Sequence, residues 1–324
     1  MAGRFSVSKS DCGGADRAAE PARAPNARVI AAHGRQLRVR TDDGEEHLTH
    51  PPGRDRQLVC GDRVCCEFDA RHDELRVVAL APRSGALYRS DARGRSELIA
   101  SNLTLLLVVA APLPAPDFYI IDRYLAAAQC AGIRPAVVLN KSDLPLDAAL
   151  ELELAAYLQL GLEVLRVSAH NSTGLPALRA LLHGQSAVLV GQSGVGKSSL
   201  LRALVPGVDA SVGALLRDDA GRHTTSAARL YLLPEGGELI DSPGVRDFAP
   251  AIDRLDAATL GFPEIGALAP HCRFADCRHL REPECAVRAA VGEHMSARRY
   301  ESYRRLRRLH ERLQAARGAP PTRG

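Results

Sequence analysis

The sequence lacks any long apolar run. Hydrophobic residues make up 46% of the 324 positions, yet no segment approaches the roughly 18 consecutive apolar residues of a membrane-spanning helix. The N-terminal segment MAGRFSVSKSDCGG also lacks the basic stretch and apolar block of a secretory signal. These absences argue against a membrane partner, and we expect a cytoplasmic protein.

The eight cysteines lack the pattern of a disulfide framework, because the chain is long and shows no export signal. Five of them are scattered, and we interpret these as reduced thiols: Cys12, Cys60, Cys65, Cys66 and Cys130. The other three lie within 14 residues together with one histidine. Three thiolates and one imidazole suit the closed four-coordinate shell of structural zinc. The predicted zinc ligands are Cys272, Cys277, His279 and Cys285. His271 could replace His279, and a core of reduced cysteines is the alternative to a metal site.

The length predicts two or three domains, and no internal repeat is present. Residues 1–26 are rich in Ala, Arg, Gly and Pro without an apolar period, so we expect a disordered tail. Residues 27–88 alternate short β-type runs with turns, which predicts a five-stranded oligonucleotide-binding-type (OB-type) barrel able to bind RNA, or a β-sandwich that only packs. Residues 89–250 mix strands and helices, and residues 251–324 hold the Cys/His cluster and a basic helix. The fold class is multidomain α/β.

The third segment has the pattern of a parallel sheet flanked by helices. Continuous apolar runs predict buried strands at residues 103–110, 136–139, 164–167 and 187–190. Helix-period segments predict helices at residues 120–131 and 148–160. The turn Pro234-Glu235-Gly236-Gly237 predicts a hairpin.

A phosphate-binding loop follows the strand at residues 187–190. The segment 191–198 matches G-x-x-x-x-G-K-[ST] and precedes a helical run, as this motif requires. Its backbone N–H groups would cradle phosphates, Lys197 would bridge the β- and γ-oxygens during hydrolysis, and Ser198 would bind Mg²⁺. The predicted contacts are Gly191, Gln192, Ser193, Gly194, Val195, Gly196, Lys197, Ser198 and Ser199. The alternative is a glycine-rich turn that binds nothing.

A second loop predicts selection of guanine. Asn140-Lys141-Ser142-Asp143 directly follows a predicted strand and matches N-K-x-D. One carboxylate can accept the adjacent N1–H and N2–H₂ donors of guanine, so Asp143 would exclude adenine. Asn140 would tie this loop to the phosphate loop, and Ser168-Ala169 would offer an N–H to the guanine O6. If the N-K-x-D match were accidental, an ATP-dependent kinase or transporter ATPase would be the alternative.

Two further segments predict contacts to Mg²⁺ and the γ-phosphate. Asp241-Ser242-Pro243-Gly244 follows an apolar strand and matches D-x-x-G, with Asp241 near Mg²⁺ and the Gly244 N–H on the phosphate; a plain turn is the alternative. Thr224 or Thr225 would supply a hydroxyl to Mg²⁺. Position 245 is valine, which cannot orient the attacking water, so His223 is the catalytic candidate, with a solvated loop histidine as the alternative.

The C-terminal helix carries an apolar stripe and many arginines. Tyr300, Tyr303, Leu306, Leu309 and Leu313 recur at helical spacing. Off this stripe lie Arg298, Arg299, Arg304, Arg305, Arg307, Arg308 and Arg312. These arginines predict either a phosphate-backbone contact surface or a solvated face.

The motif order N-K-x-D, S-A, phosphate loop, T-T, D-x-x-G is a circular permutation of the Ras-like order. With the barrel before it and the Cys/His cluster after it, the chain resembles the bacterial ribosome small-subunit-dependent GTPase A family from about Arg28 to Leu313. The resemblance includes Gly61-Asp62-Arg63-Val64 and Ile121-Asp122-Arg123-Tyr124. It implies a circularly permuted GTPase at residues 89–250 and a zinc-binding domain at 251–324.

The resemblance also implies a function. It implies a GTPase that uses GTP with Mg²⁺, binds the small (30S) ribosomal subunit and its 16S rRNA, acts in late maturation of that subunit, and leaves after hydrolysis to GDP. We expect a monomer. The alternative is a GTP-sensing RNA-binding module without significant hydrolysis, in which Val245 marks lost catalysis.

Overall fold

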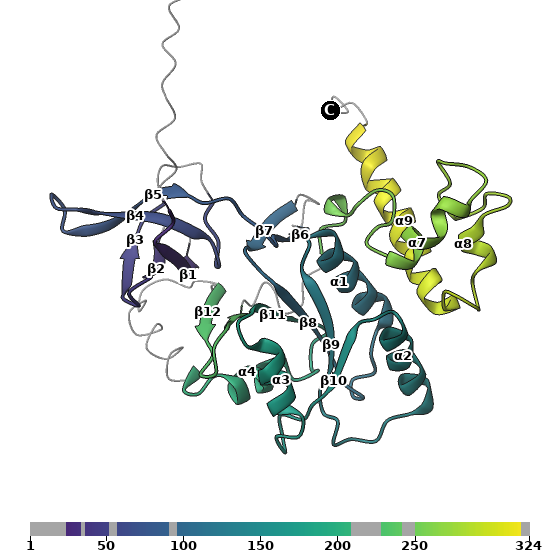
Figure 1. Cartoon of the computed structure of the whole chain (residues 1–324), viewed down its shortest axis with the longest axis horizontal. Coiled ribbons are helices and arrows are strands. Elements are labelled where there is room, and N and C mark those ends of the chain that lie inside the picture. Colours follow the sequence, from purple (N-terminus) through teal and green to yellow (C-terminus); the bar gives the residue numbers. More distant parts are fainter. Residues whose placement is uncertain are drawn as a thin grey trace, which may run out of the picture.

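The computed structural model describes residues 24–33, 36–51, 57–90, 96–208, 228–241 and 250–318. Figure 1 shows a small β-structure at one side, a central layer of strands covered by helices, and a group of helices at the other side. Most of the predicted tail, residues 1–23, lies outside this range. Within the part that is described, no helix combines the length and apolar character needed to cross a membrane.

The N-terminal strands form the predicted five-stranded barrel. They are β1 (Ala27–His33), β2 (Gln36–Thr41), β3 (Glu46–Thr49), β4 (Arg63–Asp69) and β5 (Glu74–Leu80). Strand β1 pairs with both β2 and β4, β2 pairs with β3, and β4 pairs with β5. Strand β3 lies against β5, which closes the barrel. Leu37, Val39, Val64 and Cys66 are buried in these strands, whereas Phe68 of β4 is 63% exposed.

The central sheet has the strand order β10-β9-β8-β11-β13-β12. All neighbouring pairs are parallel except β12 and β13, which form the predicted hairpin. The strands are β8 (Leu105–Ala110), β9 (Arg134–Leu139), β10 (Glu163–Arg166), β11 (Ser186–Val190), β12 (Ala228–Leu232) and β13 (Glu238–Asp241). The predicted strands are confirmed to within two residues at most ends, because continuous apolar runs are typical of strands buried on both faces.

Alternate residues of these strands pack on opposite faces of the sheet. On one face Leu106 and Val108 contact the core side of α1 (Phe118–Cys130) and α2 (Ala148–Gln159). On the other face Leu105 and Leu107 contact α3 (Leu175–Leu182) and α4 (Lys197–Leu204). The two faces therefore form two separate apolar cores. The phosphate loop and the N-K-x-D loop, both predicted to bind nucleotide, follow the carboxyl ends of parallel strands in this sheet.

The barrel continues into the central sheet. Strand β1 also pairs with β12, with Ala31 opposite Arg229 and Ala32 opposite Ala228, which gives one sheet of eleven strands. A separate hairpin of β6 (Leu87–Ser90) and β7 (Ser96–Ala100) connects the barrel to β8.

The C-terminal region packs on α1 through a third core. Its elements are η1 (Ile252–Arg254), α7 (Pro263–Leu268), η2 (Ala269–His271), α8 (Ala286–Ala289) and α9 (Ala297–Gly318). Phe262 and the predicted stripe residues Tyr303 and Leu306 contact Ala126 and Ala127 of α1 in this core.

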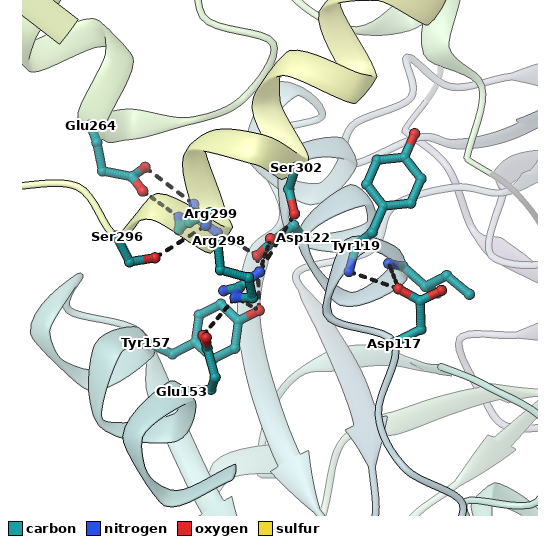
Figure 2. A network of polar contacts seen from close by, with 11 residues as sticks. Asp117, Tyr119, Asp122, Glu153, Tyr157, Glu264, Ser296, Arg298, Arg299 and Ser302 are labelled. Carbon is teal, nitrogen blue, oxygen red and sulfur yellow. Dashed lines mark hydrogen bonds and ion pairs between the residues drawn. The ribbon is translucent and has the colours of Figure 1, made fainter. Parts of the chain in front are cut away.

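The arginines of α9 divide into two groups. Arg299 and Arg307 are only 4% and 7% exposed, and Arg298 and Arg299 both bind the buried carboxylate of Asp122 on α1 (Figure 2). The prediction of one outward basic face is therefore wrong for Arg298, Arg299 and Arg307, because buried acidic or carbonyl oxygens satisfy them. Among the residues of this helix up to 315, whose side chains the structure describes, the exposed arginines are Arg305, Arg308 and Arg312, and Arg304 is partly exposed.

Candidate nucleotide and metal sites

The phosphate loop forms a tight turn between β11 and α4. Gly191 has φ of 139°, and a Cβ there would lie 2.1 Å from the Val109 carbonyl oxygen, so only glycine fits. The Lys197 amine is buried and donates to the carbonyl oxygens of Gly191 and Gln192, at 2.6 Å each. The loop therefore wraps around its own lysine, which places one cation at the N-terminus of α4.

Asn140 joins this loop to the two loops that the sequence assigned to the base. Its side chain is 1% exposed. Its Nδ2 donates to the Val195 carbonyl at 2.9 Å, and its Oδ1 accepts from the Ala169 N–H at 3.2 Å. The predicted tie between Asn140 and the phosphate loop is thus present. The Ala169 N–H, predicted to meet guanine, donates to Asn140.

Lys141 makes a second bridge. Its backbone has φ of 56°, and its amine donates to the carbonyl oxygens of Leu113 and Gly194, at 2.8 Å each. The segment after β8 is therefore part of the same assembly, and Gln192 strengthens this link because its Oε1 accepts from the Asp117 N–H at 2.8 Å. The sequence reasoning missed Leu113 and Asp117. Leu113 and Asp117 could have been predicted from their position, because they follow a buried strand at the edge of the sheet where the other loops lie.

Asp143 is held as an ionised acceptor. The Ser168 hydroxyl donates to its Oδ1 at 2.5 Å, and this hydrogen bond lowers the pKa of Asp143 below its usual value. Ser142 anchors the same loop by donating its N–H to the Val167 carbonyl at 3.0 Å. An exposed carboxylate that stays ionised can accept two neighbouring N–H donors.

Asp241 ends β13, whose parallel partner β11 leads into the phosphate loop. Ser198 and Ser199 lie in the first turn of α4, directly after Lys197. The structure thus brings together most of the predicted nucleotide residues along one edge of the sheet. His223, Thr224, Thr225, Gly244 and Val245 lie outside the described residues.

The four predicted metal ligands form one cluster. Their ligand atoms all lie within 4.8 Å of one another. The Cys272 and Cys285 sulfurs are each 3.5 Å from His279 Nδ1 and 3.9 Å from each other. Tetrahedral zinc with the usual bond lengths would place two thiolates about 3.8 Å apart and a thiolate about 3.6 Å from an imidazole nitrogen. The cluster therefore could hold a single metal ion of this size, and the histidine that lies in it is His279 rather than His271.

Hydrogen bonds from neighbouring segments hold residues 272–285, which carry the four clustered side chains. Tyr300 and Tyr303 of α9 donate to the carbonyl oxygens of His279 and Arg278, at 2.7 and 3.1 Å. Burial would raise the pKa of Glu282, but backbone N–H groups, including those of Arg281, Leu280 and Arg278, bind the carboxylate and lower its pKa to about 2. Burial also lowers the pKa of His279. A lowered pKa favours the neutral imidazole, which is the form that can bind a metal ion.

Residues 80–250, more than half of the chain, match the family model described as RsgA GTPase. The chain belongs to the RsgA GTPase family. A relative from Azotobacter vinelandii, named small ribosomal subunit biogenesis GTPase RsgA, is 45% identical over 290 residues, which are 87% of this chain and 84% of the relative. The family consists of GTP-hydrolysing enzymes, so the chain is a GTP hydrolase and the non-hydrolysing alternative is not retained.

Two solved structures have the same architecture as this RsgA family member. The crystal structure of YjeQ from Thermotoga maritima is 26% identical, with a TM-score of 0.70 over 91% of this chain and 99% of that one. YloQ, described as a circularly permuted GTPase, is 23% identical, with a TM-score of 0.65 over 89% and 96%. The predicted fold class and family are confirmed.

Proposed function

We propose that this GTPase binds the small (30S) ribosomal subunit and its 16S rRNA, acts late in maturation of that subunit, and hydrolyses GTP to GDP and phosphate when the subunit stimulates it. The observation that carries the proposal is the connection of the N-K-x-D loop to the phosphate loop through buried Asn140, in a chain 45% identical to a protein named as a small ribosomal subunit biogenesis GTPase. The OB-type barrel supports RNA binding. The protein would act as a cytoplasmic monomer.

The proposed GTP site uses the edge of the sheet described above. Asp143 would accept the guanine N1–H and N2–H₂, with Asn140, Lys141, Ser142, Ser168 and Ala169 shaping the base pocket. The segment 191–199 would bind the phosphates, together with Asp241 and Gly244. Mg²⁺ would neutralise developing phosphate charge and would be held by Ser198, Asp241 and either Thr224 or Thr225.

Hydrolysis also needs a group that orients water. Val245 has no hydrogen-bonding side chain, so we propose that His223 performs this task when the small subunit is bound. Turnover of the isolated enzyme would then be slow.

The central test is GTP turnover with purified subunits. Small subunits should raise the rate about tenfold or more, which corresponds to about 1.4 kcal/mol of transition-state stabilisation. Large subunits are the control and should leave the rate unchanged. Equal rates with and without small subunits would contradict the proposal.

The outward arginines of α9 give a variant for the same assay. Changing Arg304, Arg305 and Arg308 together to glutamine should weaken subunit binding. It should also reduce the slope of log affinity against log salt by about 0.7 to 0.9 for each RNA phosphate that the variant helix no longer neutralises. The matched control is Arg134→Gln, an exposed arginine of β9 that pairs with Glu163 of β10.

Guanine selection gives a second prediction. Asp143→Asn should weaken GTP binding about tenfold to a hundredfold, as expected for hydrogen bonds to a charged acceptor, and should shift preference toward xanthosine nucleotides. The amide offers a donor to a base edge that has gained an acceptor. Competition binding with GTP, ATP and xanthosine triphosphate measures this, with Asp147→Asn as control because Asp147 caps α2. Unchanged GTP affinity in Asp143→Asn would show that Asp143 does not bind the guanine base.

The Cys/His cluster gives a third prediction. We propose one structural zinc held by Cys272, Cys277, His279 and Cys285, because this closed ligand set leaves no open position. Metal analysis should find about one zinc per chain in the parent and in Cys130→Ala, and a loss of zinc in Cys277→Ala. Local unfolding around α8 should accompany that loss. A metal-free parent that is fully folded would overturn the assignment.

A further inference from the structure

Arg28 of the barrel binds the two strands that lead to the nucleotide edge. Its guanidinium donates to the Ser186 hydroxyl at 2.7 Å and pairs with the Glu238 carboxylate at 2.8 Å. Ser186 and Glu238 face each other as the first residues of the parallel strands β11 and β13. The side chains of Arg28 and Glu238 are only 17% and 22% exposed, so this ion pair is weakly screened by solvent.

Strand β13 depends on the barrel at two further places. Ile30 and Cys60 of the barrel are buried in the same apolar core as Ile240. The backbone at Gly61 approaches so closely that a Cβ there would lie 3.2 Å from Ile240 Cδ1 and 2.2 Å from the Ser101 carbonyl oxygen. The residue after Ile240 is Asp241. The barrel therefore contacts β13 at its first residue, Glu238, and at Ile240, which directly precedes its last residue.

The hairpin partner of β13 is also joined to the barrel. After a register shift between Val29 and Ala31, β1 leaves β4 and pairs with β12 instead. Arg229 of β12 lies opposite both Ala31 of the barrel and Asp241 of β13. A strand in a sheet moves with its hydrogen-bonded neighbours, so the position of Asp241 is set from the barrel side.

We propose that Arg28 is a positioning residue through which the OB-type barrel sets the location of Asp241 at the nucleotide edge of the sheet. Glu238 and Asp241 are three residues apart, about 10 Å along a strand. Arg28 therefore acts through β13 and does not touch nucleotide or metal. The inference rests on the proposed Mg²⁺ role of Asp241, and it makes the barrel part of the catalytic framework as well as an RNA-binding surface.

The ion pair is the part of this interface that a substitution can remove alone. Burial lowers the pKa of Arg28 from its usual value while Glu238 opposes that shift. Methionine keeps much of the apolar stem of Arg28 but cannot bind Ser186 or Glu238, whereas lysine retains the charge and can reach one partner. A purely structural role would lower thermal stability without changing the Mg²⁺ requirement.

The test is the Mg²⁺ dependence of GTP hydrolysis by the purified full chain without subunits. Arg28→Met should raise the half-saturating Mg²⁺ concentration about tenfold, the lower end of what losing hydrogen bonds to a charged group costs. GDP affinity in EDTA should stay at the parental value, and Arg28→Lys should recover most of the effect. The matched control is Arg63→Met, because Arg63 is the β4 neighbour of Arg28 and pairs with Asp42 at the surface of the barrel.

Two additional variants separate the possible failures. Asp241→Asn should shift the Mg²⁺ dependence more than Arg28→Met does. If Asp241→Asn shifts it and Arg28→Met does not, the positioning role of Arg28 is wrong while the nucleotide site stands. If neither variant shifts it, the metal role of Asp241 fails and the inference fails with it. Should Arg28→Met not fold, Glu238→Gln tests the same ion pair from the other side, and a parental Mg²⁺ dependence there overturns the proposal.

Discussion

Lys197→Ala is expected to lower the rate of GTP hydrolysis by about a hundredfold to a thousandfold, the range for removing one preorganised donor that stabilises transition-state charge. The Lys197 amine is buried at the start of α4 and encircled by the loop that carries it. The Lys141 amine also reaches the phosphate loop, but at the Gly194 carbonyl, so it does not replace the amine at the start of α4. The loss should therefore appear in kcat and not only in KM.

The fold should survive this substitution. The Lys197 amine donates to carbonyl oxygens of its own loop, and α4 is anchored instead by the apolar residues Leu200, Leu201 and Leu204. Circular dichroism and phosphate release measure the two effects separately. Arg202→Ala, an exposed cation on the same helix, is the control and should retain parental turnover. Parental hydrolysis by Lys197→Ala would show that the phosphate-loop assignment is wrong.

The sequence predicted best what depends on local patterns. Residues 105–110 are apolar without interruption, and a run of that length between turn signals is typical of a strand buried on both faces. The phosphate loop, the N-K-x-D loop and the Cys/His spacing were found for a similar reason, because each chemistry fixes residue types at short separations. The link from Asn140 to the phosphate loop also followed, since both motifs end strands of the same sheet.

Contacts between distant segments could not be predicted. The pairing of β1 with β12 joins residues about 200 positions apart, and register between strands is set by tertiary packing rather than by either strand alone. Arg298 and Arg299 were grouped with the outward arginines in the sequence analysis. Helical spacing shows which residues share one face of a helix, but it does not show whether another segment packs on that face. The sequence did contain one indication that some of these arginines are buried. Asp122 is a carboxylate that lies between the buried residues Ile121 and Tyr124 of α1. A buried acid requires a cationic partner, but the sequence does not identify it.

Asp122→Ala is expected to lower the free energy of unfolding by about 3 to 5 kcal/mol, as for other buried ion pairs that lose one partner. Asp122 is 1% exposed. Its Oδ1 accepts from Arg299 Nη1 at 2.7 Å and from the Tyr157 hydroxyl at 2.8 Å, and its Oδ2 accepts from Arg298 Nη1 (Figure 2). Removal of this carboxylate leaves the donors of Arg298, Arg299 and Tyr157 without their shared acceptor.

The neighbouring carboxylates offset only part of this loss. Glu153 binds Arg298 at 2.6 Å, and Glu264 binds Arg299, so each guanidinium keeps one anion but loses the bond that ties α9 to α1. The C-terminal helices should therefore detach from the GTPase before the central sheet unfolds. Urea unfolding followed by far-UV circular dichroism suits a chain without tryptophan. The expected result for Asp122→Ala is an additional unfolding transition at low urea concentration, which the parent does not show.

Glu301→Ala is the matched control for this prediction. It removes a surface ion pair with Arg304 on the same helix, where the side chains are 49% and 33% exposed, and exposed pairs contribute only about 0 to 1 kcal/mol. Equal unfolding curves for Asp122→Ala and Glu301→Ala would mean that apolar packing of Tyr303 and Leu306 on α1 holds the C-terminal region without help from the ion pairs. A selective loss in Asp122→Ala would instead make the buried charges the main connection between α9 and the GTPase, because Arg298 pairs with both Asp122 of α1 and Glu153 of α2.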